Sequence, residues 1–385
     1  SSHPARASPH RAATRPRAAV ACASADDGPR ACEVMTERDS RKQPPEKIGN
    51  GKYAFDKKLG AGCFGEVCRY IDSSTKEWVA VKFEPSEGHN HQLMHEVDIL
   101  KQLAQGAEPP QGFAQLFYSG REAKHNCMVM ELLGRSLEDR FQGEKQKFSA
   151  GTTALIAEQV MHRIEYLHSK GIIHRDIKPE NFMFGIKGKI HHIYLIDFGL
   201  SKNYWDYKTN SHVRLRQGLN LTGTARYASI NAHKGFEQSR RDDMEAIGHM
   251  IAYFLRGSLP WSGLDAKTQE HKYRKIKEKK ESTGLDELFG GHPEPFKNYL
   301  EDSRRLDFKD RPNYVFYREL FRSVLAKQTP KLEDHSFPWL LKKELDPLEA
   351  LVHPQSLRHP DVVAPPAQKK QNWWACCGSS PKVKD

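Results

Sequence analysis

Four polar side chains between residues 176 and 197 have the types needed for phosphoryl transfer. Residues 174–182 contain Asp176, Lys178 and Asn181, and Asp197 opens an Asp-Phe-Gly triplet further along the chain. Asp176 can orient an incoming hydroxyl group and accept its proton, while Lys178 can offset charge on the transferring phosphoryl group. Asn181 and Asp197 carry the oxygen ligands that Mg²⁺ prefers. This stretch therefore predicts phosphoryl transfer from a metal-bound nucleotide to a hydroxyl group.

A glycine-rich segment upstream could cover the phosphates of such a nucleotide. Gly60, Gly62 and Gly65 lie between two predicted strands, residues 53–59 and 66–71. Glycines let the backbone bend tightly and aim its N–H groups at phosphate oxygens. A plain hairpin or a dinucleotide-binding fingerprint could also produce this spacing, but the fingerprint requires a helix after the glycines. Because a second strand is expected there instead, the pattern favours a hairpin lid.

Lys82 and Glu96 form a second candidate pair. Lys82 lies at the end of a predicted strand, residues 78–83, and Glu96 lies in a predicted amphipathic helix, residues 92–103. The functional interpretation is that Lys82 contacts the nucleotide phosphates and that Glu96 orients it. The alternatives are a lysine that buries its stem while its ammonium reaches water, and a solvated helical glutamate.

The remaining elements predict an α+β fold with a small β-rich N-lobe and a larger, mainly α-helical C-lobe. The two lobes join near residues 131–134. Beyond the elements above, we expect a strand at 127–132, a helix at 152–168, a hairpin of 182–186 with 190–196, and an apolar helix at 243–255.

Composition divides the chain into three regions. Residues 1–50 are rich in Ala, Arg, Pro and Ser without an apolar period, so we expect a disordered N-terminal extension. Residues 53–325 should form the catalytic domain, with an N-lobe at 53–131 and a C-lobe at 135–325. Residues 326–385 should form a C-terminal extension.

Overall composition excludes several classes of protein. The apolar runs are too short to span a bilayer. Seven cysteines without the paired spacing of zinc sites, and in odd number, predict reduced intracellular thiols. The net charge of +11 fits either a solvated basic surface or attraction to acidic partners. Because aromatic and basic residues do not alternate in a ladder, we expect no nucleic-acid partner.

The order and spacing of these motifs resemble the protein kinase signature, and the resemblance covers residues 53–325. The lysine two positions after Asp176 is similar to that of Ser/Thr kinases. Most kinases close their activation segment with Ala-Pro-Glu, whereas this chain has a different sequence at 221–231. That segment is similar to the casein kinase 1 family. The further stretches that carry this resemblance are residues 130–134, 136–139, 237–243 and 256–261.

The resemblance implies a bilobal protein kinase fold and a protein Ser/Thr kinase that uses ATP and Mg²⁺. It also implies that Met130 is the gatekeeper, that Glu131–Leu133 is the hinge whose backbone bonds adenine, that Asp243 anchors the catalytic loop, and that Thr224 lies near Asp176. The implied nucleotide-binding residues are Leu59, Gly60, Gly62, Gly65, Val67, Ala80, Lys82, Glu96, Met130, Glu131 and Leu133.

The same resemblance implies protein substrates with an acidic or phosphorylated residue three positions before the acceptor. Arg216 matches one anion-binding position of the family. At a second position, where a lysine is usual, this chain has Gln269, and Lys267 is a candidate replacement. The alternative to a kinase is a non-catalytic scaffold of the same fold. That alternative is disfavoured because Lys82, Asp176, Asn181 and Asp197 are all present.

The C-terminal sequence carries an independent signal. Trp373 and Trp374 precede Cys376 and Cys377, and lysines flank the group. Tryptophans favour a membrane interface, and adjacent cysteines there can be S-acylated, so the tail predicts peripheral membrane attachment. The alternative is a tryptophan pair that folds back on the catalytic domain. We expect a monomer in the cytoplasm, with a membrane-associated or nuclear fraction left open.

Overall fold

The computed structural model describes residues 44–62, 65–87, 92–106, 110–328 and 337–341. The chain divides into two units, Ser1–Gln43 and Pro44–Asp385, and all described residues belong to the second. Three predictions concern residues outside the described part of the chain. They are the disorder of residues 1–43, the role of the tryptophan pair, and the lipidation of Cys376 and Cys377.

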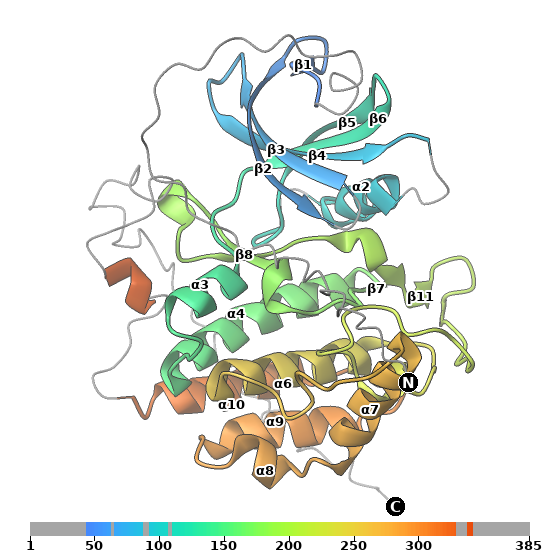
Figure 1. Cartoon of the computed structure of the whole chain (residues 1–385), viewed down its shortest axis with the longest axis vertical. Coiled ribbons are helices and arrows are strands. Elements are labelled where there is room, and N and C mark those ends of the chain that lie inside the picture. Colours follow the sequence, from blue (N-terminus) through green and yellow to red (C-terminus); the bar gives the residue numbers. More distant parts are fainter. Residues whose placement is uncertain (1–43, 63–64, 88–91, 107–109, 329–336, 342–385) are drawn as a thin grey trace, which may run out of the picture. The chain divides into compact units, whose positions relative to one another are not determined.

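The N-lobe is a six-stranded antiparallel sheet in the order β1-β2-β3-β4-β6-β5, with one helix, α2, beside it (Figure 1). Aromatic and branched side chains such as Tyr70, Val81 and Val129 form its core. The elements are β1 Lys47–Ile48, β2 Tyr53–Gly62, β3 Gly65–Asp72, β4 Trp78–Pro85, α2 Gln92–Leu103, β5 Leu116–Glu122 and β6 His125–Glu131.

The N-lobe begins earlier than the sequence predicted. Lys47 and Ile48 pair with β2, and Ile48 is only 1% exposed. The hydroxyl of Tyr70 also donates a hydrogen bond to the carbonyl oxygen of Pro45. The expectation of disorder up to residue 50 is therefore wrong for residues 44–50, because so short a strand has no apolar period to reveal it.

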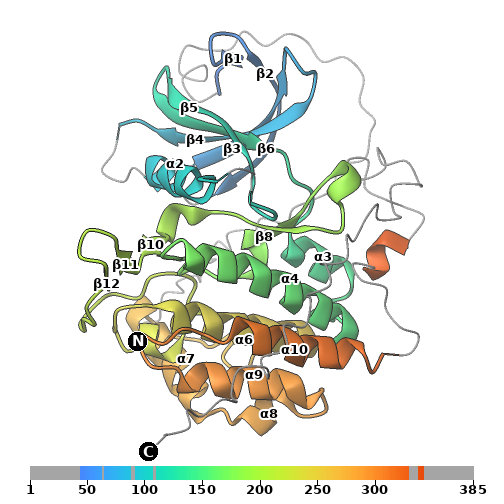
Figure 2. The same ribbon diagram turned by 180° about the vertical axis from the view of Figure 1, so that it is seen from behind.

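The C-lobe is built mainly from helices, of which α4 and α6 pass through its core (Figure 2). Its helices are α3 Leu137–Gly143, α4 Ala150–Ser169, α5 Ile230–His233, α6 Arg240–Arg256, α7 Gln269–Ser282, α8 Leu285–Phe289, α9 Glu294–Arg305 and α10 Tyr314–Leu325. Short strand pairs complete it: β7 Ile172–Ile173 with β10 Lys202–Asn203, β8 Phe182–Phe184 with β9 Ile193–Leu195, and β11 Trp205–Asp206 with β12 Ser211–His212. Single 3-10 turns lie at Pro179–Asn181, Lys187–Lys189, Phe198–Leu200 and Pro338–Leu341.

Residues from the expected C-terminal extension also join this core. Phe337 and Trp339 are 0% and 4% exposed, and both rings pack against Phe184. The guanidinium of Arg140 lies 5.8 Å from the centre of the Trp339 ring. The prediction that residues 326–385 form an extension separate from the catalytic domain is therefore incomplete, because residues 337–340 pack against that domain.

The α+β architecture with a β-rich N-lobe and a helical C-lobe is as predicted. Within the described part of the chain, Cys68 and Cys127 are buried free thiols. The helices in that part are all too short or too polar to cross a membrane.

Candidate active site

The loop that carries Asp176 is attached to α6 by the buried carboxylate of Asp243. This carboxylate accepts hydrogen bonds from the backbone N–H groups of His174 at 2.8 Å and Arg175 at 2.9 Å. It also accepts one from Nε2 of His168 at 2.9 Å. Burial alone would raise the pKa of Asp243, but these donors outweigh it and hold the pKa below its usual value. The anchoring role that the resemblance implied for Asp243 is confirmed.

His168 connects this anchor to α10. Its Nδ1 lies 2.8 Å from the hydroxyl of Tyr314, while Nε2 faces Asp243, so the ring accepts from the tyrosine and donates to the aspartate. Burial lowers the pKa of His168, which keeps the imidazole neutral and fits this tautomer. This contact could not be predicted from the sequence, because His168 and Tyr314 are 146 positions apart.

The Asp176 carboxylate is fixed on both sides. One oxygen accepts from Nζ of Lys178 at 2.6 Å, and the other accepts from the Thr224 backbone N–H at 2.8 Å and hydroxyl at 2.7 Å. Burial would raise the pKa of Asp176, but Lys178 and Thr224 outweigh it and lower the pKa. The carboxylate is therefore ionised at neutral pH and held in one orientation, as a group that accepts a proton from a hydroxyl must be.

Lys82, Glu96 and Asp197 meet on the N-lobe side of this loop. Nζ of Lys82 lies 2.7 Å from Glu96 and 3.1 Å from Asp197. Burial would lower the pKa of Lys82, but the two carboxylates outweigh it and raise the pKa, so the ammonium stays charged. The structure thus brings together three predicted site residues from β4, α2 and the segment after β9.

The two groups of residues belong to one site. The carbonyl oxygen of Asn181 accepts a hydrogen bond from the backbone N–H of Ile196 at 3.0 Å, which ties the catalytic loop to the residue before Asp197. Burial lowers the pKa of Lys178, but the carboxylates of Asp176 and, to a smaller extent, Asp197 outweigh it and raise the pKa. Asp176 and Lys178 therefore lie within the field of the Lys82–Asp197 pair.

The donor set at Asn181 and Asp197 suits Mg²⁺. The Asn181 side-chain N–H₂ donates to the Asp176 carbonyl at 2.9 Å, which leaves its amide oxygen to face a ligand. Asp197 adds a carboxylate, and Mg²⁺ commonly takes one or two protein oxygens and completes its shell with phosphates and water. Among the described residues there is no cluster of three or more acidic, histidine or cysteine side chains that would form a metal site of another kind.

Most of the predicted nucleotide-binding residues lie on neighbouring strands of the sheet or directly after its strand β6. Val67 pairs with Lys82 and Ala80 pairs with Met130 in the ladders. The other positions are Leu59, Gly60 and Gly62 in β2, Gly65 in β3, Glu96 in α2, Glu131 in β6 and Leu133 just after β6. The glycine segment forms the β2–β3 hairpin, as predicted, and no helix follows it.

Two backbone details refine this list. A Cβ atom at Gly65, where φ is +155°, would lie 1.7 Å from the Phe83 carbonyl oxygen, so only glycine fits there. The backbone N–H of Glu131 already donates to the Gln115 carbonyl at 2.9 Å. The Leu133 backbone makes no hydrogen bond to the rest of the described chain. The same holds for Leu132, so Leu132 and Leu133 are the residues of the predicted hinge whose main-chain groups are not used within the described chain.

Arg216, the predicted anion site, already has an internal partner. Its guanidinium contacts the Glu237 carboxylate at 2.6 Å, and Lys202 contacts the same carboxylate at 2.6 Å. Glu237 is 3% exposed and Arg216 is 60% exposed. Arg216 and Lys202 thus share one internal carboxylate, which offsets part of the charge that Arg216 was expected to offer to a substrate; sequence reasoning missed this contact.

A cavity of about 380 Å³ adjoins Thr224 and offers two basic side chains that sequence reasoning did not select. Arg226 and Lys272 line it and are exposed, and no ion pair of either occurs in the described part of the chain. Gln269 lines it as well, whereas Lys267 does not. The position of Lys272, three residues after Gln269 on α7, was the available signal.

A comparison with known families agrees with this geometry. A family model described as "Protein kinase domain" matches residues 53–323, which is more than half of the 385 residues.

Proposed function

Because this chain belongs to the protein kinase family, we propose that it is a protein serine/threonine kinase of the casein kinase 1 type. ATP is the phosphoryl donor and Mg²⁺ the metal, as in protein kinases generally. The observation that carries the proposal is the Asp176 carboxylate, fixed between Lys178 and Thr224 at 2.6–2.8 Å. The family resemblance of residues 221–231 and 237–243 supports the casein kinase 1 assignment.

Each residue then has a defined role in the reaction. Asp176 orients the substrate hydroxyl and accepts its proton, while the Lys178 ammonium offsets charge on the transferring group. Lys82, held by Glu96, contacts the α- and β-phosphates. Asn181 and Asp197 would hold Mg²⁺, which would neutralise charge on the phosphates of the nucleotide.

The scaffold alternative requires that part of this machinery be missing or misplaced. Instead, Lys82 is paired with both Glu96 and Asp197, and Asp176 is oriented by two donors. These contacts support catalysis over nucleotide binding alone.

Serine/threonine specificity can be tested with three peptides that differ only in the acceptor residue. We expect phosphate incorporation from γ-labelled ATP into the serine and threonine peptides, at least about 100-fold faster than into the tyrosine peptide, because misplacing a reacting atom by about 1 Å can cost that factor. Equal rates for tyrosine and serine would overturn the assignment. Absence of transfer to all three, with ATP still bound, would favour the scaffold.

We propose that the preference for acidic or phosphorylated substrates resides mainly at Arg226 and Lys272. Both line the cavity beside Thr224, which itself contacts Asp176, so a residue near the acceptor can reach them. Arg216 contributes less because its guanidinium is already held by Glu237, which offsets part of its charge. The net charge of +11 adds a general attraction for acidic peptides.

This assignment predicts how peptide KM changes. An aspartate three positions before the serine should lower KM about three- to tenfold relative to alanine, as expected for two solvent-exposed ion pairs. Arg226→Ala/Lys272→Ala should abolish this gain, whereas Arg216→Ala should reduce it less. Lys267→Ala is the matched control, since Lys267 does not line the cavity. A full gain in the double variant would refute the proposal.

A further inference from the structure

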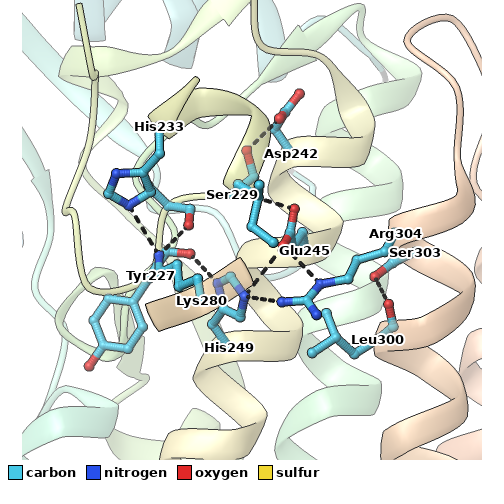
Figure 3. A network of polar contacts seen from close by, with 12 residues as sticks. Tyr227, Ser229, His233, Asp242, Glu245, His249, Lys280, Leu300, Ser303 and Arg304 are labelled. Atoms are coloured by element: carbon cyan, nitrogen blue, oxygen red, sulfur yellow. Dashed lines mark hydrogen bonds and ion pairs between the residues drawn. The ribbon is translucent and has the colours of Figure 1, made fainter. Parts of the chain in front are cut away.

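Four consecutive backbone carbonyl groups, those of residues 225–228, are each held by a side chain from elsewhere in the C-lobe. Nζ of Lys280 donates to Ala225 O at 2.9 Å and to Ala228 O at 2.5 Å. The Trp261 indole N–H donates to the carbonyl of residue 226 at 2.7 Å, and the ring of His249 bonds that of residue 227 at 2.8 Å. Figure 3 shows Lys280, His249 and their neighbours around this segment.

The side chains that make these contacts are fully inside the protein. Lys280, Trp261 and His249 are 0%, 1% and 0% exposed. A buried lysine is rare unless its N–H groups are satisfied. Here two carbonyl oxygens accept from the Lys280 ammonium, and Nε2 of His233 lies 3.3 Å away. The indole ring centre of Trp261 is 5.4 Å from the same nitrogen.

Titratable side chains from three helices surround the Lys280 side chain. His233 of α5, His249 and Glu245 of α6, and Arg304 of α9 face this region, and Arg304 pairs with Glu245 at 3.0 Å (Figure 3). Burial and the Lys280 ammonium lower the pKa of His233 to about 4, so His233 is neutral at pH 7. Burial also lowers the pKa of Lys280 to about 7, and its nitrogen has enough N–H groups to donate to both carbonyl oxygens in either protonation state.

The held segment is the one beside which a protein substrate must lie. Thr224 contacts Asp176, and residues 224–227 line the cavity that also contains Glu180 and Lys272. The sequence here lacks the Ala-Pro-Glu that most kinases carry at the end of the activation segment. The contacts of Lys280, Trp261 and His249 fix the backbone at this point of the chain.

We propose that Lys280, Trp261 and His249 form a carbonyl clamp that positions residues 225–228 for binding of the protein substrate. The proposal rests on the kinase function proposed above. In it, Lys280 is a positioning residue that touches neither ATP nor the acceptor hydroxyl. Its loss frees two carbonyl groups and loosens the cavity wall, so it weakens binding of peptide and leaves binding of ATP intact.

The clamp can be tested with two neighbouring lysines of α7. Lys280→Met removes the buried donor with little change in volume. Lys279→Met, the matched control, changes a side chain that is 40% exposed and lies 3.7 Å from Glu287. We expect Lys280→Met to raise KM for a serine peptide about tenfold or more, because it leaves two buried carbonyl groups without their donor, with KM for ATP within about twofold of wild type. Lys279→Met should leave both KM values unchanged.

Two further variants make every outcome decisive. Lys280→Arg keeps N–H donors, so its peptide KM should lie closer to wild type than that of Lys280→Met; equal values would attribute the effect to packing and overturn the clamp. If Lys280→Met fails to fold by circular dichroism, Trp261→Phe removes the donor to the carbonyl of residue 226 and keeps an aromatic ring at this position, and an unchanged peptide KM there would overturn the clamp. An inactive wild type would instead refute the kinase function itself.

Discussion

Asp176→Asn should lower kcat for phosphoryl transfer to a serine peptide by about 10²–10⁴-fold, the usual contribution of a positioned proton acceptor. An asparagine cannot take the proton of the substrate hydroxyl, although its remaining oxygen can still accept from Thr224. KM for ATP should change little, because Lys82, Glu96 and Asp197 do not contact the Asp176 side chain. Initial rates over a range of ATP and peptide concentrations give both constants.

The matched control is Asp98→Asn, which makes the same chemical change at an exposed position of α2. It should leave kcat unchanged. Thermal unfolding of each variant shows whether the fold is intact. A kcat for Asp176→Asn within tenfold of wild type, in a folded protein that binds ATP, would contradict the role given to this carboxylate.

The catalytic groups could be predicted from the sequence because their spacing is local. Asp176, Lys178 and Asn181 lie in one loop, and the structure brings them together through the 3-10 turn Pro179–Asn181. The pairing of Lys82 with Glu96 also followed from a strand and an amphipathic helix. The helices α2, α4 and α6 were recognised because an apolar period is a local property, whereas α7, α9 and α10 were not predicted.

What the sequence did not reveal depends on contacts between distant positions. Glu237 offsets the charge of Arg216 across 21 positions of sequence, and no pattern near either residue indicates the pair. Strand β5 was missed because its side chains alternate only weakly between buried and exposed.

The contacts of the carbonyl clamp could not be predicted from the sequence either. Lys279 and Lys280 are identical in type and adjacent in a polar helix, yet only Lys280 is buried. The one local hint is that Ile276 lies four positions before Lys280 and shares its face of α7.

The second large effect is expected at Asp243, on stability and on rate together. Asp243→Asn keeps one acceptor oxygen and replaces the other with an N–H₂ group. At least one of the N–H donors of His168, His174 and Arg175 then faces this N–H₂ group and loses its acceptor. Loss of a hydrogen bond to a buried charged group costs about 1.5–3 kcal/mol of the free energy of unfolding. Because the loop before Asp176 loses its attachment, kcat should also fall about 100-fold. Urea unfolding and initial rates measure the two effects.

The adjacent Asp242 is the control, because the pKa values of the two carboxylates are shifted in opposite directions. Burial raises the pKa of Asp242 to about 7, against the hydrogen bonds from Ser229 and Ser239 that lower it. The protonated form therefore contributes stability that is present in acid and lost as pH rises through 7. The pKa of Asp243 is lowered, so its contribution is present above the unfolded value of about 3.9 and lost only in stronger acid.

Stability curves against pH should thus separate these neighbours. The difference in unfolding free energy between wild type and Asp243→Asn should stay constant from pH 5 to 8, since the folded Asp243 remains ionised throughout. For Asp242→Asn the difference should be about 1 kcal/mol or less at pH 8 and grow toward pH 5, with a slope of at most about 1.4 kcal/mol per pH unit. If the difference in unfolding free energy for Asp243→Asn changed with pH over this range, the loop would be anchored by a protonated carboxyl group. The proposal that an ionised Asp243 anchors the Asp176 loop would then be wrong.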